Sequence, residues 1–312
     1  MGGFLVTGGA GFIGSHLVDA LLAAGQPVRV LDDFSTGRRE QLDPRCELLV
    51  GDVADPPTVR AALAGMQGCF HLAAIASVAA ANADWLGAHR VNQTGTLAVL
   101  DAARAARLPV VYASSAAVYG ELGGQAATET LRPAPLTAYG ADKLGSELHA
   151  AVAWRVHGVP TLGLRFFNVY GPRQDPDSPY SGVVSIFAAR LLAGAAITID
   201  GDGTQSRDFV FVADAVAHLQ AAMRHLRGAG GCEVLNVCTG QASSVLALAQ
   251  SLAGLCGCRL QVGHGPPRAG DIARSVGDPA LATARLGLRA GTGIAAGLAA
   301  TLASLRAPGM RS

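Results

Sequence analysis

The sequence is short of lysine and of charge in general. Charged residues make up 15% of the chain, and among 24 basic residues only Lys143 is a lysine. Lysine plus arginine, 24, almost balances aspartate plus glutamate, 23, for a formal net charge of +1. A chain without an excess of one sign has no strong field to concentrate nucleic acid or an anionic membrane surface. We therefore expect neither nucleic acid nor a membrane as a partner.

Long apolar runs and paired cysteines are also missing. The most apolar stretch, residues 69–81, contains His71 and Ser77 and is too short to span a bilayer. The N-terminus MGGFLVTGG has no basic segment of the kind that begins a signal peptide. Six cysteines are present without a Cys-x-x-Cys pair, which favours reduced thiols over a metal site. These absences predict a cytoplasmic protein that binds no metal ion.

What the sequence does contain is a regular alternation of short β-rich runs with helical patterns. The runs are apolar on consecutive positions, which is typical of parallel strands covered by helices on both faces. They lie at residues 4–7, 28–33, 46–52, 69–74, 109–115 and 161–167. This pattern predicts an α/β fold with a doubly wound parallel sheet (Rossmann) over residues 1–167, the dinucleotide-binding domain.

The amino-acid composition changes after residue 167. Residues 168–182 are rich in proline, glycine and aspartate, and strand-like runs return at 196–200, 207–212 and 234–238. We therefore expect a smaller, interleaved C-terminal substrate domain at 168–312, with segments around 207–240 returning to the first domain.

The segment VTGGAGFIGSHL places Gly8, Gly11 and Gly14 three residues apart between a predicted strand and a predicted helix. Glycines there permit a tight turn and let backbone N–H groups and the helix N-terminus approach a pyrophosphate. An ordinary glycine turn is the alternative. The strand and helix on either side favour the dinucleotide site.

The next predicted strand ends in Asp32 and Asp33, 18 residues after Gly14. An acidic side chain at this place can accept hydrogen bonds from the adenosine ribose and would repel the 2′-phosphate of NADP. The cofactor is therefore predicted to be NAD. Arg38 and Arg39 leave NADP open, because either guanidinium could hold a 2′-phosphate.

The single lysine lies in a predicted helix, residues 138–157, four residues after Tyr139. That spacing puts Tyr139 and Lys143 on one face of the helix. Lowering a tyrosine pKa from 10 to about 7 requires roughly 4 kcal/mol, and one ammonium at about 4 Å supplies that much with an effective dielectric near 20. We therefore predict that Lys143 suffices to activate Tyr139 as a base and also binds the nicotinamide ribose. A solvated lysine beside a half-buried tyrosine is the alternative.

Together these segments resemble the extended short-chain dehydrogenase/reductase family, in particular nucleotide-sugar 4-epimerases of the UDP-galactose 4-epimerase type. The resemblance runs from Gly3 to about Gly287. It implies that SSAAVYG and YGADK supply a catalytic triad of Ser115, Tyr139 and Lys143. The cofactor-binding residues that it implies are Gly8, Gly11, Phe12, Ile13, Gly14, Asp32, Asp33, Ser35, Thr36, Gly37, Asp52, Val53, Leu72, Ala73, Ala74, Asn92, Tyr139, Lys143 and Phe166.

The resemblance also implies a reaction. Tyr139 would take the proton of a sugar 4-OH while hydride leaves C4, which produces a 4-keto sugar. Related dehydratases and decarboxylases carry an acid directly after the residue matching Ser115, whereas this chain has Ala116 and Ala117. Without that proton donor the simplest outcome is return of hydride to the other face, which is 4-epimerisation. A one-way dehydrogenase or reductase and a non-catalytic NAD sensor remain alternatives.

Substrate residues follow from the same resemblance. Ser115 and Asn168 would contact the nucleotide sugar, and Arg207, Arg268 and Asp271 would hold its diphosphate and ribose. The small Ser275 would leave room for an N-acetyl group at C2. The implied substrates are UDP-glucose and UDP-galactose, with the N-acetyl sugars UDP-GlcNAc and UDP-GalNAc also accepted, although another pyrimidine base remains open. UDP-glucuronate is the runner-up, with Arg173 or Arg190 contacting its carboxylate.

A homodimer is expected by analogy with the same family. Its interface would be formed by the helical stretches 84–107 and 139–157 of each subunit. Leu97, Leu100 and Leu148 are the residues predicted to lie on it.

Overall fold

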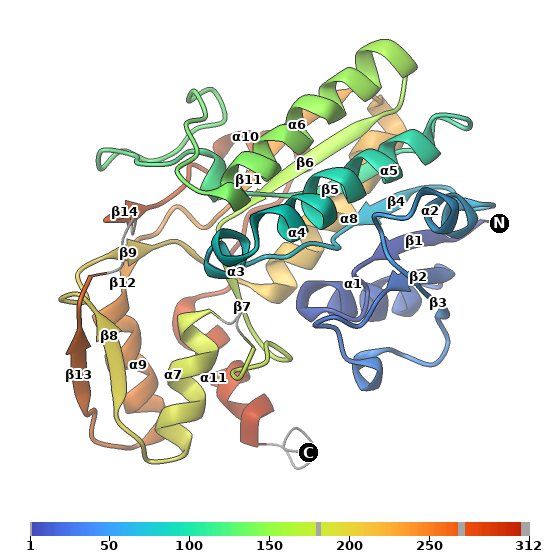
Figure 1. The fold of residues 1–312 in the computed structure, drawn as a ribbon. Helices are drawn as coiled ribbons and strands as arrows, with labels where there is room; N and C mark the ends of the chain where they lie inside the picture. The colour runs from blue at the N-terminus through green and yellow to red at the C-terminus, as the bar shows by residue number, and fades with distance from the viewer. Residues whose placement is uncertain (1, 179–181, 268–271, 307–312) are drawn as a thin grey trace.

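A seven-stranded parallel sheet forms the centre of the protein, in the strand order β11-β6-β5-β4-β1-β2-β3. The computed structural model describes residues 2–178, 182–267 and 272–306. The strands are β1 (Phe4–Thr7), β2 (Val28–Asp32), β3 (Glu47–Val50), β4 (Cys69–His71), β5 (Val110–Ser115), β6 (Thr161–Phe166) and β11 (Cys232–Val237). The six runs predicted before residue 168 and the run 234–238 all form strands of this sheet, and all the pairings are parallel (Figure 1).

Helices cover both faces of this sheet, which confirms the doubly wound fold. On one face α1 (Phe12–Ala23) packs beside α8 (Val212–Ala229), and on the other α2 (Pro56–Leu63), α5 (Gly95–Ala103) and α6 (Ala138–His157) lie side by side. Successive strand residues contribute to opposite cores, because side chains alternate across a strand. Leu162 and Leu164, for example, lie in the core under α1 and α8, whereas Val110 and Tyr112 lie in the core under α5 and α6.

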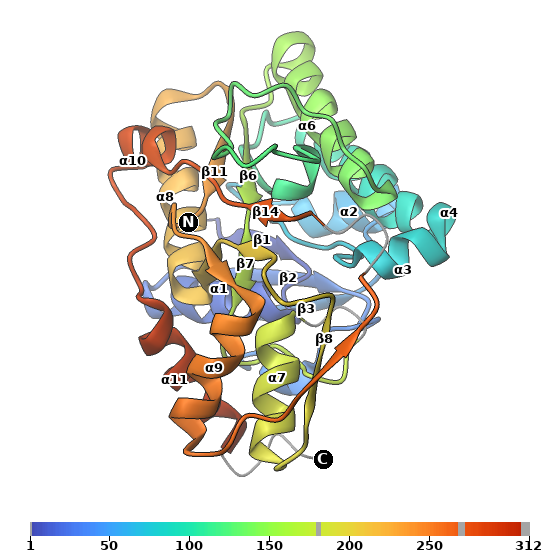
Figure 2. The same cartoon turned by 90° about the vertical axis from the view of Figure 1, so that its left-hand side faces the viewer.

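The C-terminal part of the chain builds a second, smaller lobe. Its core is shared by α7 (Val183–Leu192), α9 (Val245–Cys256) and α11 (Ile294–Arg306), with β8 (Ile197–Asp200) paired to β13 (Val262–Gly265) along one side (Figure 2). The last helix of the sheet region, α10 (Ala280–Leu286), packs against α8 and β11.

Short strands connect the lobe to the sheet. The run 207–212 is not one strand as predicted but two, β9 (Ser206–Arg207) and β10 (Phe209–Phe211), and neither joins the large sheet. The chain changes partners at Asp208, since β9 lies between β12 (Ser243–Ser244) and β14 (Arg274–Ser275), whereas β10 pairs with β7 (Asn168–Tyr170). The remaining elements are α3 (Val78–Ala83), α4 (Trp85–His89), a π-helical turn at Arg90–Thr94 and 3₁₀ turns at Arg39–Gln41 and Ala116–Val118.

Two further findings concern the apolar segments and the cysteines. Across the described ranges, no helix combines the length and the apolar character needed to cross a membrane. The six cysteines are all free thiols, and Cys69 and Cys238 are buried.

Candidate functional site

The glycine loop lies where β1 and β4 end side by side, at the point where the strand order reverses direction. This switch point is the usual ligand-binding crevice of an open parallel sheet. Gly8 has φ +69°, and a Cβ there would lie 2.7 Å from the backbone nitrogen of Ala73. A Cβ at Gly14 would lie 2.0 Å from the carbonyl oxygen of Gly8. Larger side chains would therefore separate β1, α1 and the loop after β4.

The N-terminus of α1 is suited to an anion. Gly11 is its N-cap, with no side-chain cap among the described residues, and the first turn, which includes Phe12 and Ile13, carries no acidic residue. Uncapped N–H groups at a helix N-terminus carry a partial positive charge that suits a pyrophosphate. These features fit the phosphates of a dinucleotide.

Asp32 shapes the turn that follows β2. Its carboxylate accepts hydrogen bonds from the backbone N–H groups of Ala10 and Phe34, each at 2.9 Å. Burial raises the pKa of Asp32, and the two backbone hydrogen bonds oppose that shift. A Cβ at Gly37 would come within 2.9 Å of Asp32 Oδ1, so the turn over Ser35 and Thr36 also approaches this carboxylate closely. Each carboxylate oxygen keeps a second lone pair, which leaves Asp32 able to accept from a ribose hydroxyl.

The charged residues near Asp32 have other partners. Asp33 is exposed and accepts hydrogen bonds from the N–H and hydroxyl of Ser35. The Arg38 guanidinium pairs with Asp175, 2.5 Å between Nη2 and Oδ2, and the Arg39 guanidinium lies 4.9 Å from the ring centroid of Phe34. Both arginines considered for a 2′-phosphate are thus already engaged.

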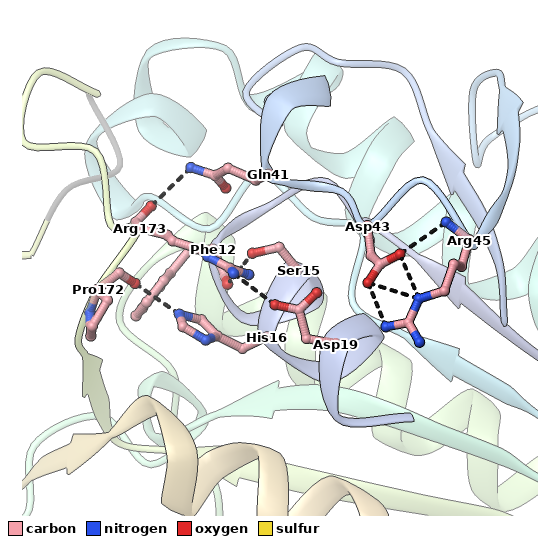
Figure 3. A network of polar contacts seen from close by, with 9 residues as sticks. All are labelled: Phe12, Ser15, His16, Asp19, Gln41, Asp43, Arg45, Pro172 and Arg173. Carbon is pink, nitrogen blue, oxygen red and sulfur yellow. Dashed lines mark hydrogen bonds and ion pairs between the residues drawn. The ribbon is translucent and has the colours of Figure 1, made fainter. Parts of the chain in front are cut away.

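The loop after β7 is fastened across α1, as Figure 3 shows. His16 donates from Nε2 to the carbonyl oxygen of Pro172 at 2.9 Å, and Arg173 pairs with Asp19 at 2.6 Å. Gln41 donates to the carbonyl oxygen of Arg173 at 3.4 Å. Arg173, one of the two arginines considered for a glucuronate carboxylate, is therefore paired with Asp19. The other, Arg190, donates to the carbonyl oxygen of Ala196.

Asn92 holds the loop that contains Leu72, Ala73 and Ala74. Its Oδ1 accepts from the N–H of Ile75 at 2.8 Å, and its Nδ2 donates to the carbonyl oxygen of Ile75 at 3.2 Å. Asn92 is buried in the π-helical turn Arg90–Thr94, a distortion often found at functional sites. Its side chain therefore supports the strand end under the glycine loop.

The structure also places three other predicted cofactor residues, namely Asp52, Val53 and Phe166. Asp52 accepts from the N–H of Ala54 at 2.7 Å and also pairs with Arg90. Val53 is buried against Gly95, and Phe166 is buried at the end of β6.

Ser115, Tyr139 and Lys143 come together where the end of β5 meets the first turns of α6. The helix begins after Thr137, whose hydroxyl accepts from the N–H of Gly140 at 3.1 Å. The Ser115 hydroxyl accepts from the N–H of Ala117 at 3.1 Å and lies close enough to the Tyr139 side chain to affect its pKa. Burial raises the pKa of Tyr139, and the neighbouring Ser115 hydroxyl opposes that shift.

Lys143 is buried, which excludes the solvated alternative. Its ammonium donates to the carbonyl oxygen of Ala113 at 2.9 Å and lies 5.7 Å from the ring centroid of Tyr139. Burial lowers the pKa of Lys143 to about 8, while Asp142 acts in the opposite direction. The prediction that Lys143 alone brings the pKa of Tyr139 to about 7 is wrong in this structure, because burial raises that pKa and the Lys143 ammonium is directed at Ala113.

Three predicted substrate residues gather around the Asp208 peptide. The N–H of Asn168 donates to the carbonyl oxygen of Asp208, and the N–H of Asp208 donates to the carbonyl oxygen of Ser275, both at 2.9 Å. Arg207 precedes Asp208 and pairs in register with Ser275. Arg207 also donates to the carbonyl oxygen of Ile272 at 2.6 Å. The other two predictions, Arg268 and Asp271, lie outside the described residues.

Asp208 itself was not predicted. Its buried carboxylate accepts from the N–H and the hydroxyl of Thr239 and from the N–H of Gly240, at 2.7 to 2.8 Å. It thereby joins β9 to the loop after β11. The only sequence signal was an acidic residue within the otherwise apolar run after Arg207.

Comparison with known proteins gives one family for most of the chain. Residues 4–238 match the NAD dependent epimerase/dehydratase family. A UDP-glucose 4-epimerase of Mycolicibacterium smegmatis is 38% identical, over 97% of this chain and 98% of its own. A UDP-N-acetyl-alpha-D-glucosaminuronate decarboxylase of Bacillus cytotoxicus is 31% identical, over 84% of this chain and 83% of its own.

Solved structures agree in fold over almost the whole length. The UDP-glucose 4-epimerase of Thermotoga maritima with UDP-glucose superposes with a TM-score of 0.93 at 35% identity, over 97% of this chain and 98% of its own. The UDP-N-acetylglucosamine 4-epimerase of Methanobrevibacter ruminantium, in complex with UDP-N-acetylmuramic acid, has a TM-score of 0.91 at 30% identity, with the same coverage of 97% and 98%.

Proposed function

Because the chain belongs to the NAD dependent epimerase/dehydratase family, we propose that it is a UDP-hexose 4-epimerase that uses NAD. One observation carries the proposal beyond the family. The neighbouring side chains of Ser115 and Tyr139 lie beside buried Lys143, and the adjacent turn offers Ala116 and Ala117 instead of an acid.

In the proposed mechanism Tyr139 takes the proton from the sugar 4-OH, and Ser115 hydrogen-bonds to the same sugar oxygen. Loss of this proton and of hydride from C4 leaves a 4-keto sugar, to which hydride and proton return with the opposite configuration. NAD, when bound, supplies the hydride acceptor and, in its oxidised form, a further positive charge in the site. The positive charge of oxidised NAD would favour the ionised phenol, against the burial that raises the pKa of Tyr139.

The turn after Ser115 favours epimerisation over elimination or decarboxylation. Elimination needs an acid for the departing hydroxide, and decarboxylation needs a proton donor for the carbon that loses its carboxylate. Ala116 and Ala117 occupy the 3₁₀ turn that follows Ser115 and have no group to donate. The keto sugar can then only be reduced again, on either face.

For the substrate we propose UDP-glucose and UDP-galactose, with the N-acetyl sugars also accepted. Asn168, Arg207 and Ser275 are adjacent in the small sheets, which supports a common role in holding the nucleotide sugar. The small side chain of Ser275 supports tolerance of a C2 substituent. The engagement of Arg173 by Asp19 weighs against UDP-glucuronate.

The test uses the purified protein without added cofactor. The protein is incubated separately with UDP-galactose, UDP-glucose, UDP-GlcNAc, UDP-GalNAc and UDP-glucuronate, and the products are separated by chromatography. We expect 4-epimers, with no net conversion of NAD to NADH. Stoichiometric NADH with a ketone product would indicate a one-way dehydrogenase. Retained NAD with no turnover of any sugar would indicate a sensor.

We also propose a homodimer formed through α4 and α6. Leu148, Val152 and Val156 follow each other at four-residue spacing on α6, and they are 63, 49 and 67% exposed. Trp85 and Leu86 are two further exposed apolar side chains, on α4, which packs against α6. An exposed apolar stripe of this extent is unusual for a monomer. Leu97 and Leu148 are exposed as expected, but Leu100 was wrongly included, because it is buried in the core under α5.

Light scattering at micromolar concentration should give twice the mass of the chain. Leu148→Glu should produce a monomer, because a carboxylate would be desolvated in the interface. Val50→Glu is the matched control, since Val50 is 60% exposed on β3 and lies outside the stripe. A monomeric wild-type protein, or a Leu148→Glu variant that still dimerises, would contradict this interface.

A further inference from the structure

Glu147 and Arg165 form an ion pair that is buried between α6 and the sheet. The two contacts are bidentate, 2.8 Å from Nε to Oε1 and 2.6 Å from Nη2 to Oε2, and the side chains are only 7 and 4% exposed. Burial of two charges costs about as much as their attraction returns, and apolar residues of similar volume often stabilise a fold equally well. Stability alone therefore does not explain this pair.

The position of Glu147 on α6 suggests another explanation. Tyr139, Lys143 and Glu147 follow one another at four-residue spacing, so they face β5 from successive turns. They contact three consecutive strand residues, 113–115. The Tyr139 side chain neighbours that of Ser115, Lys143 donates to the carbonyl oxygen of residue 113, and the Ser114 hydroxyl donates to Glu147 Oε1 at 2.5 Å.

Arg165 connects this contact to the rest of the sheet. It lies on β6, paired in register with Ser114 on β5. Its Nη1 donates to the hydroxyl of Tyr119 at 2.9 Å, and that hydroxyl donates to Asn236 Oδ1 at 2.6 Å. Burial alone would lower the pKa of Arg165, but the hydrogen bonds to Glu147 more than compensate and raise it. Glu147 is thus held against a charged group anchored on β6, on the turn after Ser115 and on β11.

We propose that Glu147 and Arg165 are positioning residues that set the rotation and axial position of α6 on β5, and with them the contact between Tyr139 and Ser115. An apolar contact could slide or rotate, whereas a bidentate ion pair has one geometry. Proton transfer needs heavy-atom distances of roughly 2.6–3.2 Å, and a displacement of about 1 Å can cost about 100-fold in rate. The kinetic part of the inference rests on the proposed function; the position of Tyr139 does not.

The decisive variant is Glu147→Met combined with Arg165→Met, which removes both charges and keeps most of the volume. We expect a thermal midpoint equal to or above that of the wild type and unchanged NAD retention. We also expect a kcat reduced about 100-fold with KM within a few-fold. Crystal structures of both proteins should show Tyr139 Oη displaced by about 1 Å relative to Ser115 Oγ in this variant. A folded variant with wild-type kcat and an intact Tyr139–Ser115 contact would overturn the proposal.

Glu147→Gln tests the same inference if the double variant fails to fold. It keeps the shape and an acceptor for Ser114 but weakens the hold on Arg165, so we expect a kcat loss of about 10-fold at constant KM. Wild-type kcat in this variant would also count against the proposal. Glu233→Gln is the matched control, because Glu233 pairs with Arg285 at 3.2 Å at the partly exposed edge of the sheet and should leave kcat unchanged. If the wild type epimerises none of the sugars but Tyr139 still moves in the double variant, the positioning role stands and the proposed function fails.

Discussion

Lys143 donates its ammonium hydrogen bond to the carbonyl oxygen of Ala113, at 2.9 Å, and not to the hydroxyl of Tyr139. The lysine therefore fastens α6 to β5 while its charge lies 5.7 Å from the centre of the tyrosine ring. Lys143 can therefore fix the position of Tyr139 without lowering its pKa, although a simple charge argument treats these as one effect.

Replacement of Tyr139 by phenylalanine should abolish nearly all turnover, at least about 1000-fold, because the phenol carries the transferred proton. NAD should remain bound, since the glycine loop and Asp32 are untouched. Turnover and bound NAD are both measured on the purified variant. Tyr112→Phe is the matched control, because the buried Tyr112 hydroxyl has no hydrogen-bond partner in the described part of the chain. Substantial activity in Tyr139→Phe would point to another base.

Lys143→Arg should be badly impaired, about 100-fold or more in kcat, although it keeps the positive charge. A planar guanidinium in the space of a compact ammonium cannot reproduce the hydrogen bond to Ala113 without displacing α6. Steady-state kinetics at saturating substrate provide the measurement. Near-normal kcat would mean that charge, and not geometry, is what the site requires.

Lys143→Met should stabilise the fold while it removes activity. Burial lowers the pKa of Lys143 from 10.5 to about 8, which corresponds to a cost of about 3 kcal/mol for the charged form at neutral pH. Between about pH 8 and 10.5 the unfolded chain binds a proton at this lysine that the folded protein does not bind. The free energy of unfolding of the wild type should therefore rise with pH in that window, relative to the variant. Denaturant titrations of both proteins from pH 7 to 10 test this, and parallel pH profiles would refute it.

Asp32→Asn should weaken NAD binding by about 10-fold or more. The amide nitrogen that replaces one carboxylate oxygen cannot accept from the N–H of Ala10 or Phe34, so one of these buried donors loses its partner. Asp33→Asn is the control, since Asp33 is exposed and contacts only Ser35 among its described hydrogen bonds. NAD affinity is measured by titration of the cofactor-free proteins. An equal loss of NAD affinity in both variants would contradict the separate roles of Asp32 and Asp33.

Ser275→Tyr should reduce turnover of UDP-GlcNAc and UDP-GalNAc far more than that of UDP-glucose and UDP-galactose, by about 10-fold or more in relative kcat/KM. A bulky ring excludes an N-acetyl group without removing diphosphate contacts. Ser243→Tyr is the matched control, because Ser243 pairs with Arg207 from the opposite side of β9. Equal losses for both sugar classes in Ser275→Tyr would remove the steric argument.

The parts of the fold that depend on local sequence were predictable. The helix predicted over 138–157 has those bounds in the structure, because Thr137 caps its first turn and Gly158 ends it with φ +67°. The glycine loop and the six strands before residue 168 were also predictable from the local sequence. The strand predicted over 207–212 was not, because its break at Asp208 depends on hydrogen bonds to Asn168 and Ser275, which lie far away in the sequence.

The proximity of Tyr139 and Lys143 could be predicted, but the electrostatics around them could not. Spacing alone brings Tyr139 and Lys143 to one face of a helix, but the desolvation that raises the tyrosine pKa depends on what the fold packs around it. The roles of Glu147 and Asp208 were not predicted, for a related reason. Their partners, Arg165 and Thr239, are 18 and 31 residues away, and nothing in the local sequence indicates a buried carboxylate.

The attachment of the proposed substrate residues Asn168 and Ser275 to the Asp208 peptide has an evolutionary consequence. Asn168 and Ser275 are held through backbone atoms, so their side chains can be exchanged without loss of the hydrogen bonds that locate them. New sugar preferences can then arise by single substitutions on an unchanged frame, provided that the carboxylate of Asp208 remains. A lineage of such proteins should therefore vary at position 275 more freely than at position 208.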